Sequence, residues 1–236
     1  MEYLSNIELY YTELASINDN KFLLREAEFN HATKVMRNKL GDKIFASDGN
    51  GKIYEGIIST IDNKFLQAEI FKTHIYDNYL SNVTFCIPNL KNPDRLKFAL
   101  EKCTELGITN FIIYNSSRTI KKSISLNRLE KIVLSAMKQS LLSYLPKIEI
   151  VNSTVEFSNI KSAKIIFDQT TNKNLVDFDF ENQKKYFLIF GPEGSLTDAE
   201  VNLIDPTKKL NLAKNRLRSE TAVVKAASLI SSKYFV

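Results

Sequence analysis

The hydrophobic pattern of the chain changes near residue 82. Before that point the apolar residues form short runs of strand-like composition, Lys43–Ser47, Ile53–Ile58 and Leu66–Phe71, without long helical periodicity. The sequence Asp-Gly-Asn-Gly at 48–51 separates the first two runs and predicts a tight hairpin turn. Short strands joined by such turns are typical of a small β-barrel.

We therefore expect a first, barrel-like domain over residues 1–72. One short helix is expected within it, over Glu26–Asn38. Residues 73–81 carry no clear pattern, and we interpret them as a linker that leaves His74 exposed at its surface.

After residue 82 strand-like and helix-like runs alternate, which predicts an α/β domain over 82–236. One helix is expected to start with Asn92 as its cap and Pro93 in its first turn. Apolar residues at helical spacing within 129–141 predict a second helix. Strands are expected at the following apolar runs: Val83–Ile87, Phe111–Tyr114, Lys164–Asp168, Tyr186–Phe190 and part of Leu203–Leu212.

The last segment, Ser219–Ser231, predicts a helix that is apolar on nearly every side except at Lys225. A helix with this pattern is buried on most sides. Each Val, Leu or Ile that it buries fully contributes about 1.5–3 kcal/mol to stability. We therefore expect the end of the chain to belong to the core of the second domain.

Composition narrows the class of protein. Of the 236 residues, 44% are hydrophobic and 25% charged, which suits one large or two smaller globular domains. Cys86 and Cys103 lie in apolar contexts and are expected to be buried free thiols, with neither a disulfide framework nor a bound metal. No apolar run approaches ~18 residues, and the N-terminus lacks the features of a secretory signal. We expect a cytoplasmic protein that does not bind membranes.

The net charge of +5 says less than the clustering of the basic residues. Lys208–Arg218 holds five basic residues and no acid, and His31–Leu40 holds three with a histidine. Clustered cations predict a polyanionic partner, most commonly an RNA backbone, although a solvated charged face is the alternative for any one cluster. A third cluster comprises Arg118, Lys121, Lys122, Arg128 and Lys131.

A glycine-containing loop, GPEGSLTDAE at Gly191–Glu200, follows a strand-like run directly. Thr197 and Glu200 have the spacing of a capping box, so a helix is expected to begin near Asp198. Such a loop at the carboxyl end of a strand is a common ligand position in open α/β sheets, and an ordinary turn is the alternative. Phosphate-binding loops, dinucleotide fingerprints, serine-hydrolase elbows and metal-spaced ligand sets are absent from the sequence.

The loop GPEGSLTDAE, taken together with LNLAKNRLRSETA at Leu210–Ala222, resembles the RsmE family. These are uridine N3-methyltransferases of small-subunit (16S) ribosomal RNA within the SPOUT superfamily. LEKCTELGI at Leu100–Ile108 agrees, and His31–Gly56 is similar to the family's N-terminal PUA-like RNA-binding barrel. The resemblance covers nearly the whole chain. It implies a C-terminal trefoil knot, S-adenosylmethionine as cofactor, a homodimer, and ribosomal RNA in the 30S particle as substrate.

The resemblance also implies that three segments form a cofactor pocket without a metal. Small residues in the glycine-containing loop would let main-chain groups reach the cofactor, and several main-chain hydrogen bonds at about 1 kcal/mol each support micromolar binding. The residues implied to bind the cofactor are Asp168, Gln169, Phe190, Gly191, Pro192, Glu193, Gly194, Ser195, Leu210, Leu212, Ala213, Asn215 and Leu217.

Methyl transfer from a sulfonium is an in-line displacement, so the protein mainly positions the reactants. Ring N3 of uridine must lose its proton, and a nearby cation favours the resulting anion. Arg218 is the first candidate for this catalytic role. Glu220 either accepts this proton or holds Arg218 in place. The alternative is a structural role, in which Glu220 supports the start of the final helix. The residues expected to contact RNA are His31, Lys34, Arg37, Arg118, Lys214 and Arg216.

The chain departs from the family pattern in two places. Where the family usually has EQSGR, this chain has KQSLL, with Lys138 for the glutamate and Leu142 for the arginine. Ala213 and Arg216 stand where the family usually has glycine and an aliphatic residue. One hypothesis is that Arg216 replaces the missing arginine across the pocket while Leu142 fills the aliphatic space. Independent drift is the alternative.

Two other functions remain open from the sequence. One is a ribose 2′-O-methyltransferase of tRNA or rRNA, which would carry asparagine- and serine-rich loops in place of LRSETA. The other is a non-catalytic RNA-binding or ribosome-assembly protein that retains the knot. The intact glycine-containing loop argues against this last reading, and the altered KQSLL stretch argues for it.

Overall fold

The protein is described by a computed structural model that covers residues 4–119, 124–181 and 183–234. Lys121 and Lys122 of the third basic cluster lie outside these residues. The chain divides into two compact units. The first contains Met1–Asn78 and Met137–Leu145, and the second contains Tyr79–Ala136 and Pro146–Val236.

The first unit is built on a six-stranded sheet of order β1-β4-β5-β6-β3-β2. Strand β1 is parallel to β4, and the other pairs are antiparallel. Its core comes from buried side chains such as Phe22, Ile44 and Leu66, which alternate with more exposed positions along their strands. The strands and helical turns are β1 (Leu9–Tyr11), η1 (Leu14–Ser16), β2 (Ile17–Asn18), β3 (Lys21–Arg25), α1 (Glu26–Asn30), η2 (His31–Val35), β4 (Lys43–Ser47), β5 (Lys52–Ile61) and β6 (Phe65–Ile75).

The predicted hairpin turn is confirmed between β4 and β5. Asp48 Oδ1 accepts hydrogen bonds from the main-chain N–H groups of Asn50, at 2.8 Å, and Lys52, at 3.2 Å. Gly49 and Gly51 have φ angles of 70° and 98°, in the left-handed region that glycine adopts without strain. The turn therefore fixes the register of the hairpin.

The expected exposure of His74 is wrong. Strand β6 continues to Ile75, so the segment expected as a linker begins as part of the sheet. His74 is buried there, and its Nε2 lies 3.1 Å from Oε2 of Glu55, which is also buried and accepts a hydrogen bond from Lys43. The strand extends because antiparallel pairing with β5 continues beyond the apolar run from which the prediction was made.

The helix expected over Glu26–Asn38 is shorter and less regular. An α-helical turn, α1, is followed by the π-helical turn η2. Arg37 has a φ angle of 59°, which is incompatible with continuing a right-handed helix. The chain therefore leaves the helix before the predicted end.

A segment distant in sequence completes the first unit. The main-chain N–H of Gly51 donates to the carbonyl of Ser143 at 3.0 Å, and the N–H of Leu145 donates to the carbonyl of Gly49 at 2.9 Å. Lys138 Nζ forms an ion pair of 2.6 Å with Oε1 of Glu28. Lys138, one of the departures from the family pattern, thus has a structural partner within this unit.

The second unit is built on a parallel six-stranded sheet of order β12-β10-β11-β7-β8-β9. The chain builds β7, β8 and β9 outward in one direction and then crosses to the other side of β7, where β11 fits between β7 and β10. Its strands and 3₁₀ turns are β7 (Val83–Pro88), β8 (Asn110–Tyr114), β9 (Lys147–Val151), η3 (Thr154–Asn159), β10 (Ala163–Phe167), η4 (Leu175–Asp177), β11 (Tyr186–Ile189) and β12 (Lys208–Leu210).

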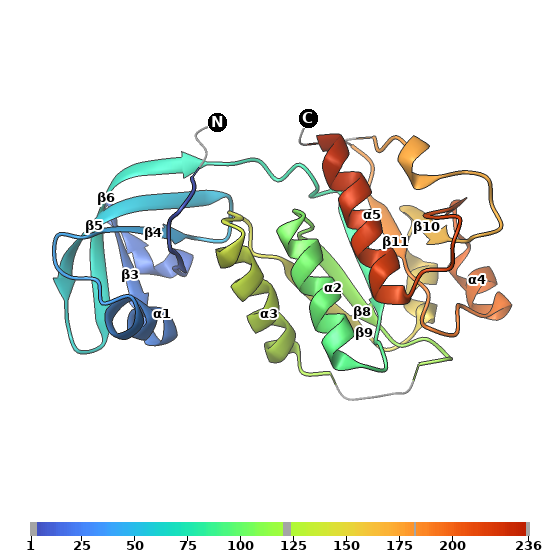
Figure 1. Ribbon diagram of the computed structural model, residues 1–236, viewed down its shortest axis with the longest axis horizontal. Coiled ribbons are helices and arrows are strands. Elements are labelled where there is room, and N and C mark those ends of the chain that lie inside the picture. The colour runs from blue at the N-terminus through green and yellow to red at the C-terminus, as the bar shows by residue number, and fades with distance from the viewer. Residues whose placement is uncertain (1–3, 120–123, 182, 235–236) are drawn as a thin grey trace. The chain divides into compact units, whose positions relative to one another are not determined.

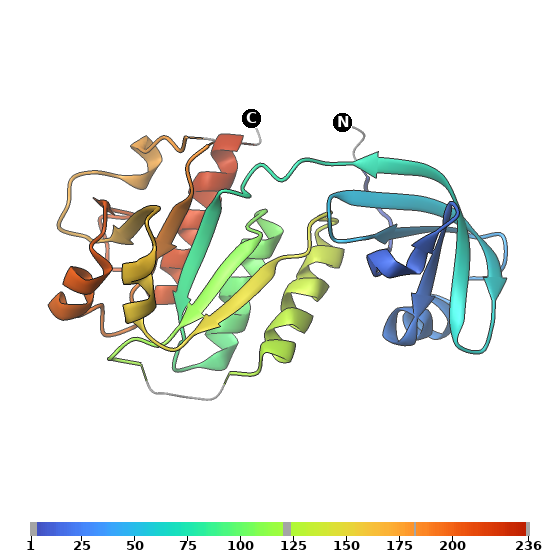
Figure 2. The ribbon, with the colours of Figure 1, turned by 180° about the vertical axis from the view of Figure 1, so that it is seen from behind.

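Helices cover both faces of this sheet. In Figure 1, α2 (Pro93–Glu105), α3 (Leu126–Gln139) and α5 (Ser219–Tyr234) lie on one side, and Figure 2 shows the strands in front of them from behind. Val133 and Val223 of these helices share a core cluster with Phe85 of β7. The opposite face packs against α4 (Asp198–Ile204) and η3, through Ile204 and Phe157. The unit is a three-layer α/β structure.

The predicted caps and the buried C-terminal helix are confirmed. Asn92 accepts a hydrogen bond from the N–H of Asp94 at 2.8 Å at the start of α2. Helix α5 buries Val223, Ala226 and Ile230 against α2 and the sheet. Helix α5 is therefore part of the core, as the sequence predicts for Ser219–Ser231.

Cys86 and Cys103 are buried free thiols, also as predicted. Burial raises the pKa of both thiols. Among the residues that the structure describes, no group of His, Cys, Asp and Glu side chains is arranged to hold a metal ion. Within the same three ranges, no helix is long and apolar enough to cross a bilayer.

The capping box of α4 provides a first test of local stability. Thr197 Oγ1 accepts from the N–H of Glu200 at 3.2 Å, and Glu200 Oε2 accepts from the N–H of Thr197 at 3.0 Å. Replacement of Thr197 by Ala is expected to lower the free energy of unfolding by about 1 kcal/mol, because a helix N–H loses its acceptor. Urea denaturation measures the change. The variant Thr197→Ser keeps the hydroxyl and should match the wild type; equal stability of the alanine variant would contradict the prediction.

Candidate active site

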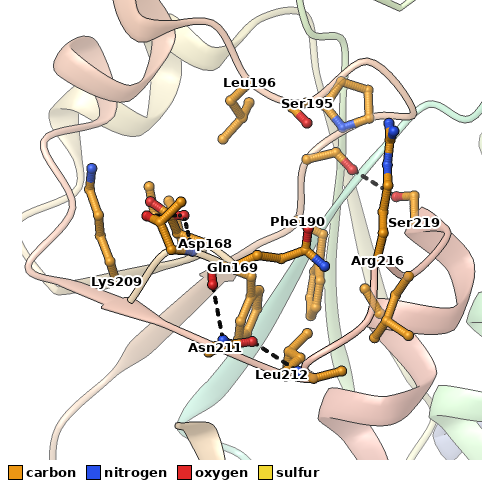
Figure 3. A pocket seen from close by; sticks show the side chains of 18 of the residues that line it. Asp168, Gln169, Phe190, Ser195, Leu196, Lys209, Asn211, Leu212, Arg216 and Ser219 are labelled. Carbon is orange, nitrogen blue, oxygen red and sulfur yellow. Dashed lines mark hydrogen bonds between the residues drawn. The ribbon is translucent and has the colours of Figure 1, made fainter. Parts of the chain in front are cut away.

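A pocket of about 660 Å³ opens at the carboxyl ends of β10, β11 and β12. Parallel strands end at the same edge of a sheet, so the loops that follow them converge there. Asp168 and Gln169 follow β10, Phe190 and Gly191 follow β11, and the segment from Asn211 follows β12. In Figure 3, Ser195 and Leu196 lie across the cavity from Asn211 and Leu212. We call this the strand-end pocket.

Asn211 joins two walls of the strand-end pocket. Its side-chain Nδ2 donates to the carbonyls of Gln169 and Thr171, both at 3.2 Å, and its Oδ1 accepts from the N–H of Ala213 at 2.9 Å. Its main chain also pairs with the segment before η4, because the N–H of Asn211 donates to the carbonyl of Lys173. The loops after β10 and β12 are thereby held together (Figure 3).

The third wall is the loop Gly191–Thr197. Ser219, the first residue of α5, donates its hydroxyl to the carbonyl of Gly191 at 2.8 Å. Ser195 adopts a left-handed φ of 62°, and its N–H donates to the carbonyl of Pro192 at 2.9 Å. The loop is thus a tight turn fixed at one end to α5 and at the other to the capping box of α4.

The strand-end pocket combines an apolar floor with available main-chain donors. Phe190 is buried, and its ring stacks on that of Phe167 with centroids 4.7 Å apart. Within the described part of the chain, the N–H groups of Gly191, Leu212 and Leu217 form no hydrogen bond with protein atoms. Such groups are available to a ligand that has both a flat apolar part and hydrogen-bonding edges.

Asp168 supplies a negative charge at one end of the pocket. Hydrogen bonds from the N–H and the hydroxyl of Thr170, at 2.9 and 2.8 Å, lower the pKa of the Asp168 carboxyl, and the nearby Lys209 lowers it further. The carboxyl is therefore ionised at neutral pH and suits an ammonium or sulfonium ligand, or a ribose hydroxyl as a hydrogen-bond donor.

Most of the residues implied to bind a cofactor line the strand-end pocket. Gly194 and Leu210 do not: the carbonyl of Gly194 accepts a hydrogen bond from Arg118 Nη1 on the outer side of the loop, and the side chain of Leu210 is in the core. Those that do line it are Asp168, Gln169, Phe190, Gly191, Pro192, Glu193, Ser195, Leu212, Ala213, Asn215 and Leu217.

Of the two candidate catalytic residues, Arg218 lines the pocket and Glu220 does not. Arg218 is exposed, so its guanidinium is accessible to a substrate. Glu220 is buried, its Oε1 lies 3.6 Å from Nε of Arg95, and among the described residues its Oε2 has no hydrogen-bond partner. The structure thus pairs Glu220 with Arg95 of α2.

Sequence reasoning missed part of the lining. Asn211 was inside a recognised segment, but its side-chain bonds depend on how β10 and β12 pair, which the sequence does not reveal. Arg95, which contacts Glu220 but does not line this pocket, has the sequence pattern of an ordinary polar residue on a helix surface. The other lining residues that were not predicted are Ile166, Phe167, Thr170, Leu196, Asp198, Val201, Lys209, Ser219 and Ala222; several of them only flank predicted ones.

The residues expected to contact RNA fall in both units. His31, Lys34 and Arg37 belong to the first; Lys34 and Arg37 are exposed, whereas His31 is half-buried, 3.4 Å from Oε1 of Glu8. Arg118, Lys214 and Arg216 belong to the second unit and are exposed, and Arg216 lines the strand-end pocket. Leu142 lies in the first unit and Arg216 in the second, and their exchange stays a prediction.

Comparison with known proteins finds RNA methyltransferases as relatives of this chain. A family model described as an RNA methyltransferase domain matches residues 78–231, more than half of the chain, and a model described as an RNA methyltransferase PUA domain matches residues 24–71. The chain is 28% identical over 224 residues to a ribosomal RNA small subunit methyltransferase E 1 of Borreliella burgdorferi, covering 89% of this chain and 92% of that protein.

A second relative is the ribosomal RNA small subunit methyltransferase E of Bacillus subtilis, 23% identical over 228 residues and covering 89% of each chain. A solved structure of a ribosomal RNA small subunit methyltransferase E from Neisseria gonorrhoeae, bound to S-adenosyl methionine, matches with a TM-score of 0.85 at 25% identity. It covers 98% of this chain and 100% of that chain. The resemblance seen in the sequence is confirmed: this chain belongs to the RNA methyltransferase family whose domain spans residues 78–231.

Proposed function

We propose that this protein transfers a methyl group from S-adenosylmethionine to ring N3 of a uridine in small-subunit ribosomal RNA. The observation that carries the proposal is the strand-end pocket, whose open main-chain groups and apolar floor lie beside an exposed arginine, Arg218. Relatives at 22–28% identity over most of the chain are named as small-subunit rRNA methyltransferases, which supports this RNA as the substrate.

The strand-end pocket fits S-adenosylmethionine. Its volume of about 660 Å³ lies in the usual range for cofactor sites. The N–H groups of Gly191, Leu212 and Leu217 suit the edges of an adenine, Phe190 suits its flat face, and the ionised Asp168 suits the ribose hydroxyls or a positive charge. When bound, this cofactor supplies an electrophilic methyl group on a sulfonium.

The residues of this chain then orient and activate the uridine. The N3–H proton must pass to solvent before N3 attacks, so the ring would meet the methyl group as an anion, and its negative charge would fall as the N–C bond forms and the C–S bond breaks. We assign Arg218 to this charge, because it lines the pocket and is exposed to an incoming base. The contact between Glu220 and Arg95 favours a positioning role for Glu220 over proton acceptance.

We further infer that the C-terminal segment forms a trefoil knot and that the first unit closes as a PUA-like barrel that binds RNA. The hydrogen bonds of Asn211 and Ser219, which tie the last forty residues to the loops after β10 and β11, support the first inference. The PUA match at residues 24–71 supports the second. We also propose that the protein acts in the cytoplasm as a homodimer on the 30S particle.

Nucleoside analysis of small-subunit rRNA tests the proposed function. In cells that lack this protein, mass spectrometry is expected to find N3-methyluridine absent from this RNA, with all other modified nucleosides unchanged. Loss of a 2′-O-methylated nucleoside instead would indicate a ribose methyltransferase. An unchanged nucleoside profile together with defective 30S assembly would indicate a non-catalytic assembly protein, and either result would overturn the proposal.

A further inference from the structure

A second cavity, of about 620 Å³, lies next to the strand-end pocket and carries no assigned role. Three cations line it: Lys91, which precedes α2, Arg95 in the first turn of α2, and Arg118 from the loop after β8. One carboxylate, Glu193, lines it as well. We call this the α2 pocket. These cations outnumber the nearby carboxylates even when Glu220, which contacts Arg95 from α5, is counted, and this balance favours an anionic ligand.

The α2 pocket adjoins the proposed methyl-transfer site through the loop Gly191–Thr197. Glu193 lines both pockets. Arg118, which lines the α2 pocket, donates from Nη1 to the carbonyl of Gly194, and this hydrogen bond holds its guanidinium against the same loop. A ligand in the α2 pocket therefore lies one loop away from a ligand in the strand-end pocket.

Arg95 is held in place by two carboxylates from different elements. Its Nη1 lies 3.9 Å from Oε1 of Glu193, and its Nε lies 3.6 Å from Oε1 of Glu220 in α5. The second oxygen of Glu220 is buried and, among the described residues, has no hydrogen-bond partner. A buried carboxylate with an unsatisfied oxygen is costly, so its position opposite Arg95 suggests that its use is to orient this guanidinium.

Neither arginine uses all of its hydrogen-bonding capacity on the protein. A guanidinium has five N–H donors, and the contacts that the structure records for Arg95 and Arg118 involve only some of them. The remaining donors have the forked geometry that matches phosphate oxygens. Two oriented guanidiniums on one cavity are thus suited to a phosphodiester.

We propose that the α2 pocket binds a phosphate-bearing nucleotide of the RNA substrate, adjacent to the uridine, and so sets which base enters the strand-end pocket. The proposal rests on the proposed function. Phosphate contacts fix the register of a nucleic acid on a protein, and a base that reacts must first leave its stack. Clamping the neighbouring phosphate would hold the strand while the uridine turns inward.

The test uses three pocket variants: Arg95→Gln, Arg118→Gln and the double variant that combines them. The control is Lys97→Gln, which removes a charge from an exposed position of α2 outside the pocket. The probe is a labelled, unmodified small-subunit rRNA transcript, and its affinity is measured over a series of salt concentrations. Each pocket variant is expected to weaken binding about tenfold and to reduce the slope of log affinity against log salt by about 1. The control variant should match the wild type in slope.

Calorimetry with S-adenosylmethionine and thermal unfolding separate a ligand role from a structural one. The affinity for S-adenosylmethionine should be unchanged in the pocket variants, and the unfolding temperature of Arg118→Gln should also be unchanged. Arg95→Gln is expected to unfold at a lower temperature, because the buried carboxylate of Glu220 loses its charged partner. If Arg118→Gln lowers the unfolding temperature, Arg118→Lys, which retains the charge, should restore the salt slope. Wild-type slopes in all pocket variants, or a slope that Arg118→Lys does not restore, would overturn the proposal.

The outcome is independent of the proposed function, because RNA binding is measured without catalysis. If the wild-type protein methylates uridine and the pocket variants keep the wild-type salt slope, only the proposal for the α2 pocket is refuted. If the wild-type protein makes no N3-methyluridine but the pocket variants have a reduced salt slope, only the proposed function is refuted. The variants could instead abolish binding of inorganic phosphate or uridine monophosphate and leave the affinity for RNA unchanged. That result would indicate a free phosphate or nucleotide as the ligand and would also overturn the proposal.

Discussion

Replacement of Arg218 by Gln is expected to reduce kcat for uridine methylation about 10²–10³-fold, with little change in the affinity for S-adenosylmethionine. The expected size follows from the loss of one charged donor to the negative charge that loss of the N3 proton creates and that the ring still partly carries in the transition state. Because a cation near the ring lowers the pKa of the uridine N3–H, its removal should also shift the rise of kcat with pH toward higher pH. Single-turnover kinetics over a pH series measures both effects.

Two variants control this experiment. Arg218→Lys keeps a positive charge and should recover part of kcat and most of the pH profile. Lys161→Gln removes a charge from an exposed position that does not line the strand-end pocket, and it should behave as wild type. A kcat that stays at the wild-type value in Arg218→Gln, or an unshifted pH profile, would remove Arg218 from the mechanism.

Replacement of Asn211 by Ala is expected to lower the free energy of unfolding by about 2–3 kcal/mol and to raise the Kd for S-adenosylmethionine at least about tenfold. Three side-chain hydrogen bonds are lost, each contributing about 1 kcal/mol, and they join the walls of the strand-end pocket. The N–H of Leu212 then loses its fixed position toward the ligand. Denaturant titration and calorimetry give the two quantities.

Asn211→Asp separates the contributions of the amide. This variant retains the acceptor for Ala213 but loses the donor to Gln169 and Thr171, so an intermediate effect is expected. Asn202→Ala removes an exposed amide from α4 and should leave stability and affinity unchanged. Wild-type affinity in Asn211→Ala would show that the walls do not depend on this residue.

The alternation of strands and helices in the second unit could be predicted because central strands such as β7 and β8 are mostly buried apolar runs, and α2 and α4 begin with capping residues. Strand β9 was missed because its exposed positions carry Lys147 and Glu149, which break the apolar run at the sheet edge. The short strands β1, β2 and β3 were missed because they are defined by pairing partners more than by their own composition.

The candidate site could be predicted in part. The glycine-containing loop and the LRSETA segment carry local constraints that are visible in the sequence, and both contribute walls of the strand-end pocket. The orientation of Glu220 toward Arg95 could not be predicted, because it depends on the packing of α5 against α2, and these helices are more than a hundred residues apart in sequence. The strand order around β11 is likewise non-local, since strands distant in the chain are neighbours in the sheet.

The segment Met137–Leu145, which bonds to the turn between β4 and β5, has a consequence for synthesis of the protein. Gly49 and Gly51 form main-chain hydrogen bonds with residues that the ribosome adds almost a hundred positions later. An emerging chain of 78 residues therefore lacks part of its own first unit and leaves those groups without their native partners. The N-terminal unit can be completed only after translation reaches residue 145, by which point Tyr79–Ala136 of the second unit has already been made.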